Sequence, residues 1–418
     1  MSLTVLAEGE LRCVLLSLSL LLLASYSFGK LFALLHTPKV VGQITGGIVL
    51  GGTCMAYFFP EVMGGIFSGF PEEGKVLNIF YQLGLIFLMF ASGLNTRIAI
   101  DHGRLRLVMI LFVGATLLPF VVGYFIYPHF QGDFMGPLDS ETAFMLVFLD
   151  SLAVTSIPVI SQIFFDLKLM NTNFSNTVLT VATIQDLFLW ILLNSAIAIA
   201  VGQGKDMGSM LLTIAVTILL FFIAHQAKKL PSITMGMSSA SFCTLVLVFL
   251  FLMITALSEL HINVMYSAFI SGYVVKFLAQ GNEDYLRKVD AVTDVAFSFF
   301  IPVYFALIGI QLNLIHDFSL AAFLMYFAIS FGLEFLGCYS ALQFTDLQKK
   351  AIVNFSIVMN ARGGPGIVLA TVAYYYQIIN VAFFTILILA TMLSSALAGY
   401  WLEYQKGRDS SIFEQMEK

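Results

Sequence analysis

The chain has 418 residues, of which 59% are apolar and only 11% are charged. A soluble globular protein carries about 25% charged residues, so this composition excludes an ordinary soluble protein and indicates a membrane protein. The four cysteines have neither CxxC nor Cys–His spacing, so we expect no disulfide framework and no resident metal. There is no phosphate-binding loop, catalytic triad or nucleic-acid-binding patch, and we expect no cofactor.

Long apolar stretches follow one another along the chain. A helix that crosses a bilayer needs about 20 mostly apolar residues, and about thirteen stretches meet this requirement. They are too long and too uniformly apolar for the strands of a membrane barrel. The expected fold is therefore an all-α polytopic membrane protein surrounded by the lipid bilayer. The expected spans are roughly 11–35, 40–59, 78–98, 105–127, 142–165, 174–202, 207–227, 236–257, 262–279, 292–313, 318–342, 349–376 and 380–404.

The basic residues are distributed unevenly between the two sides of the membrane. When the connections between spans are assigned alternately to the two sides, most of the 20 basic residues fall on one side. The positive-inside rule makes that side cytoplasmic. We therefore expect the N-terminus outside and the C-terminus in the cytoplasm.

Two of the expected spans carry helix breakers near their midpoints. The fifth contains Pro158, and the twelfth contains Gly363, Gly364 and Pro365. Interrupted helices expose backbone carbonyls and half-helix ends, which an ion-lined cavity can use but a lipid-facing position cannot tolerate. The breaks lie seven spans apart, so the two broken helices run in opposite directions, and spans 4–6 and 11–13 are expected to form an inverted repeat. The alternative is that Pro and Gly merely kink two packed helices.

Few polar or ionisable residues lie within the spans. Asp186 lies near the middle of span 6, Asp150 in span 5, and Glu334 in span 11; Asn360 and Arg362 lie in the interrupted stretch of span 12. An ionised group in the middle of a membrane costs about 2.5–3.5 kcal/mol even on lenient scales, so such residues are functional candidates.

Asp186 is the strongest of these candidates. Removal from water favours the protonated form of a carboxyl group, so a proton and a dehydrated alkali cation can compete for the same side chain. If only an occupied site crosses between the two faces of the membrane, this competition is an exchange cycle. The alternative is a buried Asp186 that is paired with a neighbouring hydroxyl or with Arg362.

The other candidates keep two interpretations each. Thr155 and Ser156 offer hydroxyl and carbonyl oxygens that suit a hard cation, or they serve ordinary helix packing. Glu334 is either a second acid of the ion site or a structural partner of Arg362. Asp150 either lines a water funnel or caps a polar patch, and Asn360 is grouped with these auxiliary residues.

Several motifs resemble one known family. The stretch 153–193 (AVTSIPVISQIFFDLKLMNTNFSNTVLTVATIQDLFLWILL) resembles the broken helix and the following acidic helix of the monovalent cation:proton antiporter superfamily. The most similar branch holds the plant cation/H⁺ exchangers and the bacterial Kef-type and NapA-type antiporters. Further matches occur in the family's order at 38–51, 259–272, 300–309 and 359–369.

The resemblance implies an NhaA-like fold in a homodimer that works by an elevator-like motion in the inner membrane. A core, about 105–202 and 318–404, would contain two discontinuous helices that cross, and a scaffold would comprise about 11–98 and 207–313. No nucleotide-binding domain is expected after the last span. We therefore expect a transporter of K⁺ or Na⁺ against H⁺, not an enzyme.

The resemblance also implies roles for particular residues. Asp186 would be the shared carboxylate for cation and proton, with Thr155 and Ser156 nearby. Gln185 stands where members that move net charge have Asp, which favours electroneutral one-for-one exchange. Glu334 stands where many relatives have Lys, and this reversal of charge leaves ion choice and stoichiometry open.

Two other functions are weighed against exchange. A sodium-coupled symporter of an organic anion would use Arg362 beside a half-helix to bind the anion. An intramembrane aspartyl protease would need Asp186 and a second, glycine-flanked Asp that share a water molecule.

Overall fold

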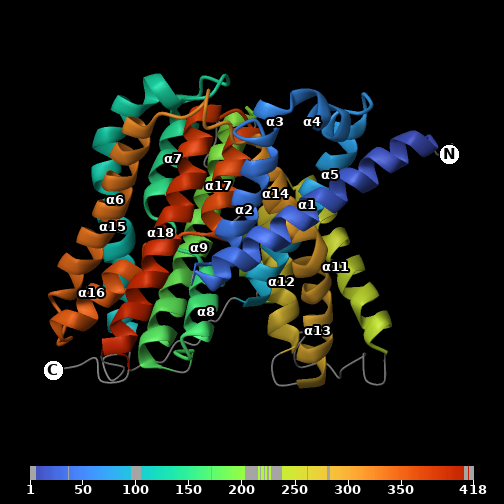
Figure 1. Ribbon diagram of the computed structural model, residues 1–418. Helices are drawn as coiled ribbons and strands as arrows, with labels where there is room; N and C mark the ends of the chain where they lie inside the picture. Colours follow the sequence, from blue (N-terminus) through green and yellow to red (C-terminus); the bar gives the residue numbers. More distant parts are fainter. Residues whose placement is uncertain are drawn as a thin grey trace.

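The computed structural model describes residues 6–35, 37–95, 105–170, 172–202, 215–216, 218–220, 222–223, 226, 238–260, 262–279, 283–408 and 413, and this part is almost wholly helical (Figure 1). Its β pairing is limited to an isolated bridge between Met135 and Ile379. In hydrocarbon every backbone N–H and C=O group must be satisfied within the protein, and a helix does this within one segment. The expected all-α membrane fold is confirmed.

The helices differ widely in length, from a single turn to seven or more turns. In chain order they are α1 (Glu8–Leu34), α2 (Lys39–Leu50), α3 (Met55–Phe58), α4 (Pro60–Phe67), α5 (Glu73–Asn95), α6 (Leu105–Phe134), α7 (Glu141–Leu152), α8 (Ile157–Asp166), α9 (Asn173–Ala200), α11 (Ser239–Glu259), α12 (Val264–Ala279), α13 (Glu283–Val295), the π-helix η2 (Ala296–Phe300), α14 (Ile301–Gln311), α15 (Leu320–Leu342), α16 (Lys349–Val358), α17 (Gly364–Tyr375) and α18 (Val381–Arg408).

Within the described residues, 10 helical stretches are long and apolar enough to cross a membrane. Helices occupy every expected span except 207–227, most of which lies outside the described residues. The protein is thus a multi-pass membrane protein, while the count of about thirteen spans stays a prediction.

The expected span over 40–59 is not one continuous helix. α2 ends at Leu50, the backbone of Gly51 is extended, and the chain turns before α3 begins at Met55. A Cβ atom on Gly51 would lie 2.7 Å from the carbonyl oxygen of Ile310, and one on Gly46 would lie 2.7 Å from that of Ala24. Small residues therefore let α2 lie tightly between α1 and α14, as is common among helices in membranes.

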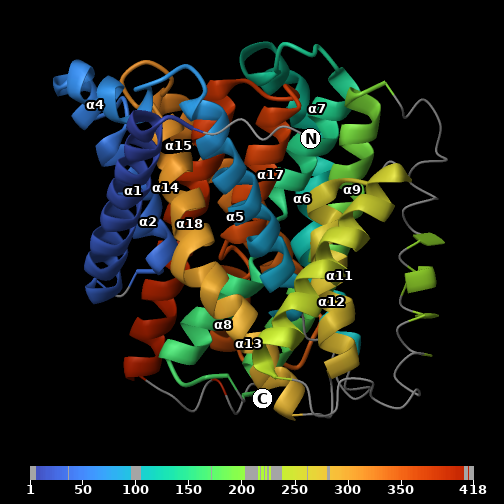
Figure 2. The same cartoon turned by 90° about the vertical axis from the view of Figure 1, so that its right-hand side faces the viewer.

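One group of helices packs around α2 and its neighbours. α1 packs on α2, α2 packs on α14, and α5 packs on both α12 and α14 (Figure 2). α11 packs on α12, and α13 continues through η2 into α14. This group comes from the first and the middle parts of the chain.

A second group contains the remaining long helices. α6 packs on α15, α7 and α6 pack on α9, α15 packs on α16, and α17 packs on α18. Both interrupted segments belong to it. Figure 1 shows α7 and α17 in the upper half of the molecule, and α8 and α16 in the lower half. The order of continuous, broken and continuous helix therefore occurs twice, as α6, α7–α8, α9 and as α15, α16–α17, α18.

Candidate functional site

The break between α7 and α8 is set by a proline and a serine. Pro158 lies in the first turn of α8, where a missing backbone N–H removes no helical hydrogen bond. Ser156 is the N-cap, and its hydroxyl accepts a hydrogen bond of 3.4 Å from the N–H of Val159. The chain therefore restarts a helix directly after the break instead of continuing α7.

The break between α16 and α17 lies directly against the first one. The N–H of Ser156 donates to the carbonyl of Ala361 at 2.8 Å, and the hydroxyl of Thr155 donates to the carbonyl of Met359 at 2.7 Å. A Cβ atom on Gly363 would lie 2.6 Å from the Ser156 hydroxyl, so a glycine is required for this close approach. The two predicted interruptions are confirmed, and the two discontinuous helices cross.

The carbonyl groups at the end of α7 find partners from other helices. Arg362 donates to the carbonyls of Ser151 and Leu152, each at 2.9 Å. The side-chain amide of Gln185 donates to the carbonyl of Ala153. A helix end leaves its last carbonyls unsatisfied, and here one guanidinium and one amide satisfy three of them. A cation at this position also faces the negative end of the helix dipole.

Arg362 and Glu334 form a buried ion pair. The Nη2 atom of Arg362 lies 3.1 Å from Oε2 of Glu334, and both side chains are excluded from solvent. Glu334 also accepts a hydrogen bond of 3.2 Å from the Thr155 hydroxyl. Of the two interpretations kept open for Glu334, the structure shows the pairing with Arg362.

Asp186 lies at the middle of α9 and is 1% exposed. Neither of its carboxylate oxygens has a hydrogen-bond partner among the described residues. The alternative that Asp186 is paired with a hydroxyl or with Arg362 is therefore wrong for these residues. Unpaired buried carboxylates are costly in a membrane interior and are usually functional there.

Asp186 lines a small cavity between α7, α9 and α17. The other lining residues are Asp150, Val154, Leu189, Trp190, Leu193, Pro365 and Leu369. The walls are otherwise apolar, so an ion that entered this cavity would experience strong attraction to a carboxylate.

The structure places the predicted residues in two sets. Thr155, Ser156, Asn360, Glu334 and Arg362 lie at the crossing, where their side chains bond to backbone and to one another. Asp186, Asp150 and Pro365 lie together at the cavity, and Gln185 lies beside Asp186 with its amide on the first break.

Tyr326 is a polar residue of this site that sequence reasoning missed. The hydroxyl of Tyr326 donates to both the carbonyl and the hydroxyl of Ser151, at 3.1 and 2.8 Å. It thereby supports the same end of α7 that Arg362 holds. A tyrosine inside a long apolar helix has no distinguishing signal in the sequence.

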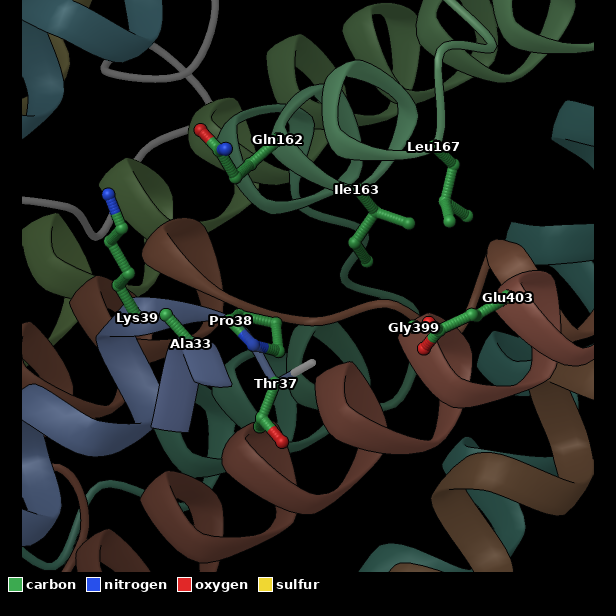
Figure 3. A pocket seen from close by; sticks show the side chains of 9 residues that line it. All are labelled: Ala33, Thr37, Pro38, Lys39, Gln162, Ile163, Leu167, Gly399 and Glu403. Carbon is green, nitrogen blue, oxygen red and sulfur yellow. The ribbon is translucent and has the colours of Figure 1, made fainter. Parts of the chain in front are cut away.

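A larger pocket lies at the other end of the crossing helices, between the two groups of helices (Figure 3). Its walls come from the connection of α1 to α2, from α8 and from α18. Lys39 and Glu403 supply charges of opposite sign to its lining, and Gln162 supplies an amide. The pocket therefore has polar walls, and it lies at one end of the molecule between elements of both groups.

Crossing broken helices beside a buried, unpaired carboxylate define a class of protein, the secondary transporters. In the part of the chain that the structure describes, no three His, Cys, Asp or Glu side chains gather to hold a resident metal ion. The chain belongs to the sodium/hydrogen exchanger family, because the profile of that family's transmembrane region matches residues 18–404.

Three relatives of this chain are named as antiporters. The chain is 25% identical over 398 residues to the Na⁺/H⁺-K⁺ antiporter GerN of Bacillus cereus, covering 93% of this chain and 95% of the relative. It is 23% identical over 410 residues to cation/H⁺ antiporter 15 of Arabidopsis thaliana, covering 93% of this chain. It is 26% identical over 299 residues to K⁺/H⁺ antiporter 1 of Saccharomyces cerevisiae, covering 68% of this chain. The chain spans only 48% of the plant protein and 33% of the yeast protein.

A solved structure shares the fold. The sodium proton antiporter MjNhaP1 of Methanocaldococcus jannaschii aligns with a TM-score of 0.62 and 14% identity, over 95% of this chain and 97% of that one.

Proposed function

We propose that this chain exchanges a monovalent cation, Na⁺ or K⁺, for H⁺ across the cell membrane. The observation that carries the proposal is Asp186, whose two buried oxygens lie unpaired beside the crossing of two broken helices. The family and the names of the relatives support it, since GerN is a Na⁺/H⁺-K⁺ antiporter and the yeast relative a K⁺/H⁺ antiporter.

In the proposed cycle Asp186 holds either a proton or a cation from which water has been removed. The site crosses between the two membrane faces only when it is occupied, so each outward passage of one ion is coupled to the inward passage of the other. Gln185 next to Asp186 carries no charge, and we propose one-for-one, electroneutral exchange.

The proposed movement takes place between a core, 105–202 and 318–404, and a scaffold, 11–98 and 207–313. The pocket of Figure 3 supports this division, because Lys39 and its neighbours come from the scaffold while Gln162 and Glu403 come from the core. The distribution of basic residues favours an external N-terminus and a cytoplasmic C-terminus. We also propose a homodimer, which the family resemblance implies.

The two rival functions are less well supported. Both Nη atoms of Arg362 are engaged by Glu334 and by three backbone carbonyls, so they are not presented to an organic anion. The protease alternative is dropped, because the family is one of transporters.

The first prediction tests exchange itself. Purified protein is reconstituted into proteoliposomes with an imposed pH gradient and a fluorescent pH reporter, and Na⁺, K⁺ and Li⁺ are added in turn. We expect at least one cation to collapse the gradient, and we expect Asp186→Asn to abolish this collapse because the shared carboxylate is lost. Full collapse by Asp186→Asn protein would refute the role of Asp186. No response from well-folded wild-type protein to any cation would overturn the antiport proposal.

A further inference from the structure

A second carboxyl group lies in the cavity of Asp186. Asp150 is in the last turn of α7 and is 2% exposed, and its Oδ1 atom has no hydrogen-bond partner among the described residues. Both aspartates line the same small cavity. They come from helices that pack directly on each other, α7 and α9.

The protein does not compensate the charge of this pair. None of the residues that line the cavity is basic. Arg362, which lies at the same end of α7, directs its Nη atoms to Ser151, Leu152, Ser330 and Glu334. Asp150 also lies at the negative end of the α7 dipole, where a carboxylate is disfavoured. When both acids are ionised at such a position, their charge has to be balanced by a cation from outside the protein; otherwise the carboxyl groups take up protons.

A structural role does not explain Asp150 either. A carboxylate that caps a helix accepts from N–H groups at an N-terminus, whereas Asp150 lies near a C-terminus, where the free groups are carbonyls. Those carbonyls are satisfied by Arg362, Tyr326 and Gln185. Asp150 is therefore not needed to complete the backbone of the break.

We propose that Asp150 and Asp186 bind the transported monovalent cation together, with Asp150 as the second carboxylate ligand. The inference rests on the proposed function, and it adds a ligand from the broken helix to the site on α9. Alkali cations are hard ions that favour carboxylate and carbonyl oxygens. The C-terminal ends of half-helices supply such ligands in other transporters. A cation between the two side chains also removes the repulsion between them.

Consequently, Asp150 should determine how tightly the cation binds. We expect Asp150→Asn to raise the cation concentration for half-maximal collapse of the pH gradient by about tenfold or more, because a charge–charge contact in a low-dielectric site is lost. Exchange should still be measurable at high cation concentration, because Asp186 remains. Asp133→Asn, which removes an exposed carboxylate at the end of α6, is the matched control and should match the wild type.

The same series separates the two proposals. If wild-type protein exchanges ions and Asp186→Asn does not, antiport stands whatever Asp150→Asn does. A half-maximal concentration equal to that of the wild type would then overturn the role of Asp150 alone. A change in the maximal rate alone would also overturn the role of Asp150 as a ligand. That result would place Asp150 on the access route and not at the bound ion.

A measurement on the unmodified protein covers the case in which Asp150→Asn does not fold. Tl⁺ replaces alkali cations and scatters strongly, so a structure of wild-type protein with Tl⁺ locates the ion directly. Density within coordination distance of both carboxylates is expected. Density on Asp186 without contact to Asp150, or no density with Tl⁺ that is demonstrably transported, would contradict the proposal.

Discussion

Arg362 has the largest number of polar contacts at the crossing. It holds carbonyls of Ser151 and Leu152 on α7, and on α15 it holds the carbonyl of Ser330 and the carboxylate of Glu334. A buried ion pair adds little net stability compared with apolar residues, but removing one partner leaves an uncompensated charge. Arg362 is therefore a position where a small change has a large cost.

We predict that Arg362→Met lowers the free energy of unfolding by about 3–5 kcal/mol, the usual cost of breaking a buried ion pair. The melting temperature of detergent-purified protein, followed by intrinsic fluorescence, measures the loss. Arg106→Met, at an exposed position in the first turn of α6, is the control and should change little.

The double variant Arg362→Met with Glu334→Met tests the cause. The double variant leaves no unpaired buried charge behind. Its loss in free energy of unfolding should therefore be smaller than the sum of the losses in the two single variants. Strict additivity would show that the pair is not energetically coupled.

At the scale of single residues, the sequence singled out candidate site residues but not the contacts that they make. Asp186 could be singled out because a charge in the middle of an apolar helix is costly. The partner of Arg362 could not be chosen, because Glu334 lies 28 residues away and pairing depends on how α15 packs on the broken helix. The shared cavity of Asp150 and Asp186 was missed for the same reason. The two side chains meet only because α7 packs on α9.

At the scale of helices, the crossing depends on a small residue at the second break. A Cβ atom on Gly363 would meet both Ser156 and Val159, whereas one on Gly364 would meet nothing closer than 3.9 Å. The two adjacent glycines therefore form a matched pair for mutation.

We predict that Gly363→Ala destabilises the protein by about 1–3 kcal/mol through overpacking, and that it reduces exchange because the two breaks are pushed apart. Gly364→Ala should retain near wild-type melting temperature and exchange. The melting temperature and the proteoliposome assay give both readouts. Equal behaviour of the two variants would contradict the proposed role of Gly363.

The elements themselves were largely predictable. Apolar length predicted the helices, and Pro158 and Pro365 marked the breaks because a proline belongs in the first turn of a helix. The end of α2 at Leu50 was missed, because a glycine next to a glycine within an apolar run fits close packing as well as a break. The short helices α3 and α4 were missed because they are far below the length of a span.

At the scale of the whole molecule, a hydrogen bond joins the two groups of helices near the pocket of Figure 3. The hydroxyls of Thr37 and Tyr400 lie 2.9 Å apart, and Tyr400 also donates to the carbonyl of Leu35 at 2.7 Å. Thr37 precedes α2 and Tyr400 lies on α18, so this contact would break if the core moved against the scaffold.

We predict that a cross-link at this contact blocks exchange. Thr37→Cys and Tyr400→Cys are introduced after the four native cysteines are replaced, and a short, reducible bifunctional thiol reagent joins them. Exchange should fall to background and return after reduction, because the proposed cycle needs the two groups to move apart. Each single cysteine variant, treated in the same way, is the control. Full exchange by cross-linked protein would contradict movement at this contact.

The sequence patterns of this chain alone do not divide it into a core and a scaffold. The boundaries came from the family resemblance, because apolar runs look alike wherever they pack. Which helices touch is decided by features such as the glycines of α2, and their role becomes clear only when the opposing backbone, at Ala24 and Ile310, is known.

Most hydrogen bonds at the crossing have a main-chain group on at least one side, such as the carbonyls of Ala361 and Met359. Main-chain groups are identical whatever side chain a residue carries. The apolar wall of the cavity, Leu189, Leu193 and Leu369, contributes nothing to these bonds. Protein engineers can therefore resize these three leucines in a combinatorial library to alter ion preference while the framework that holds the carboxylates stays intact.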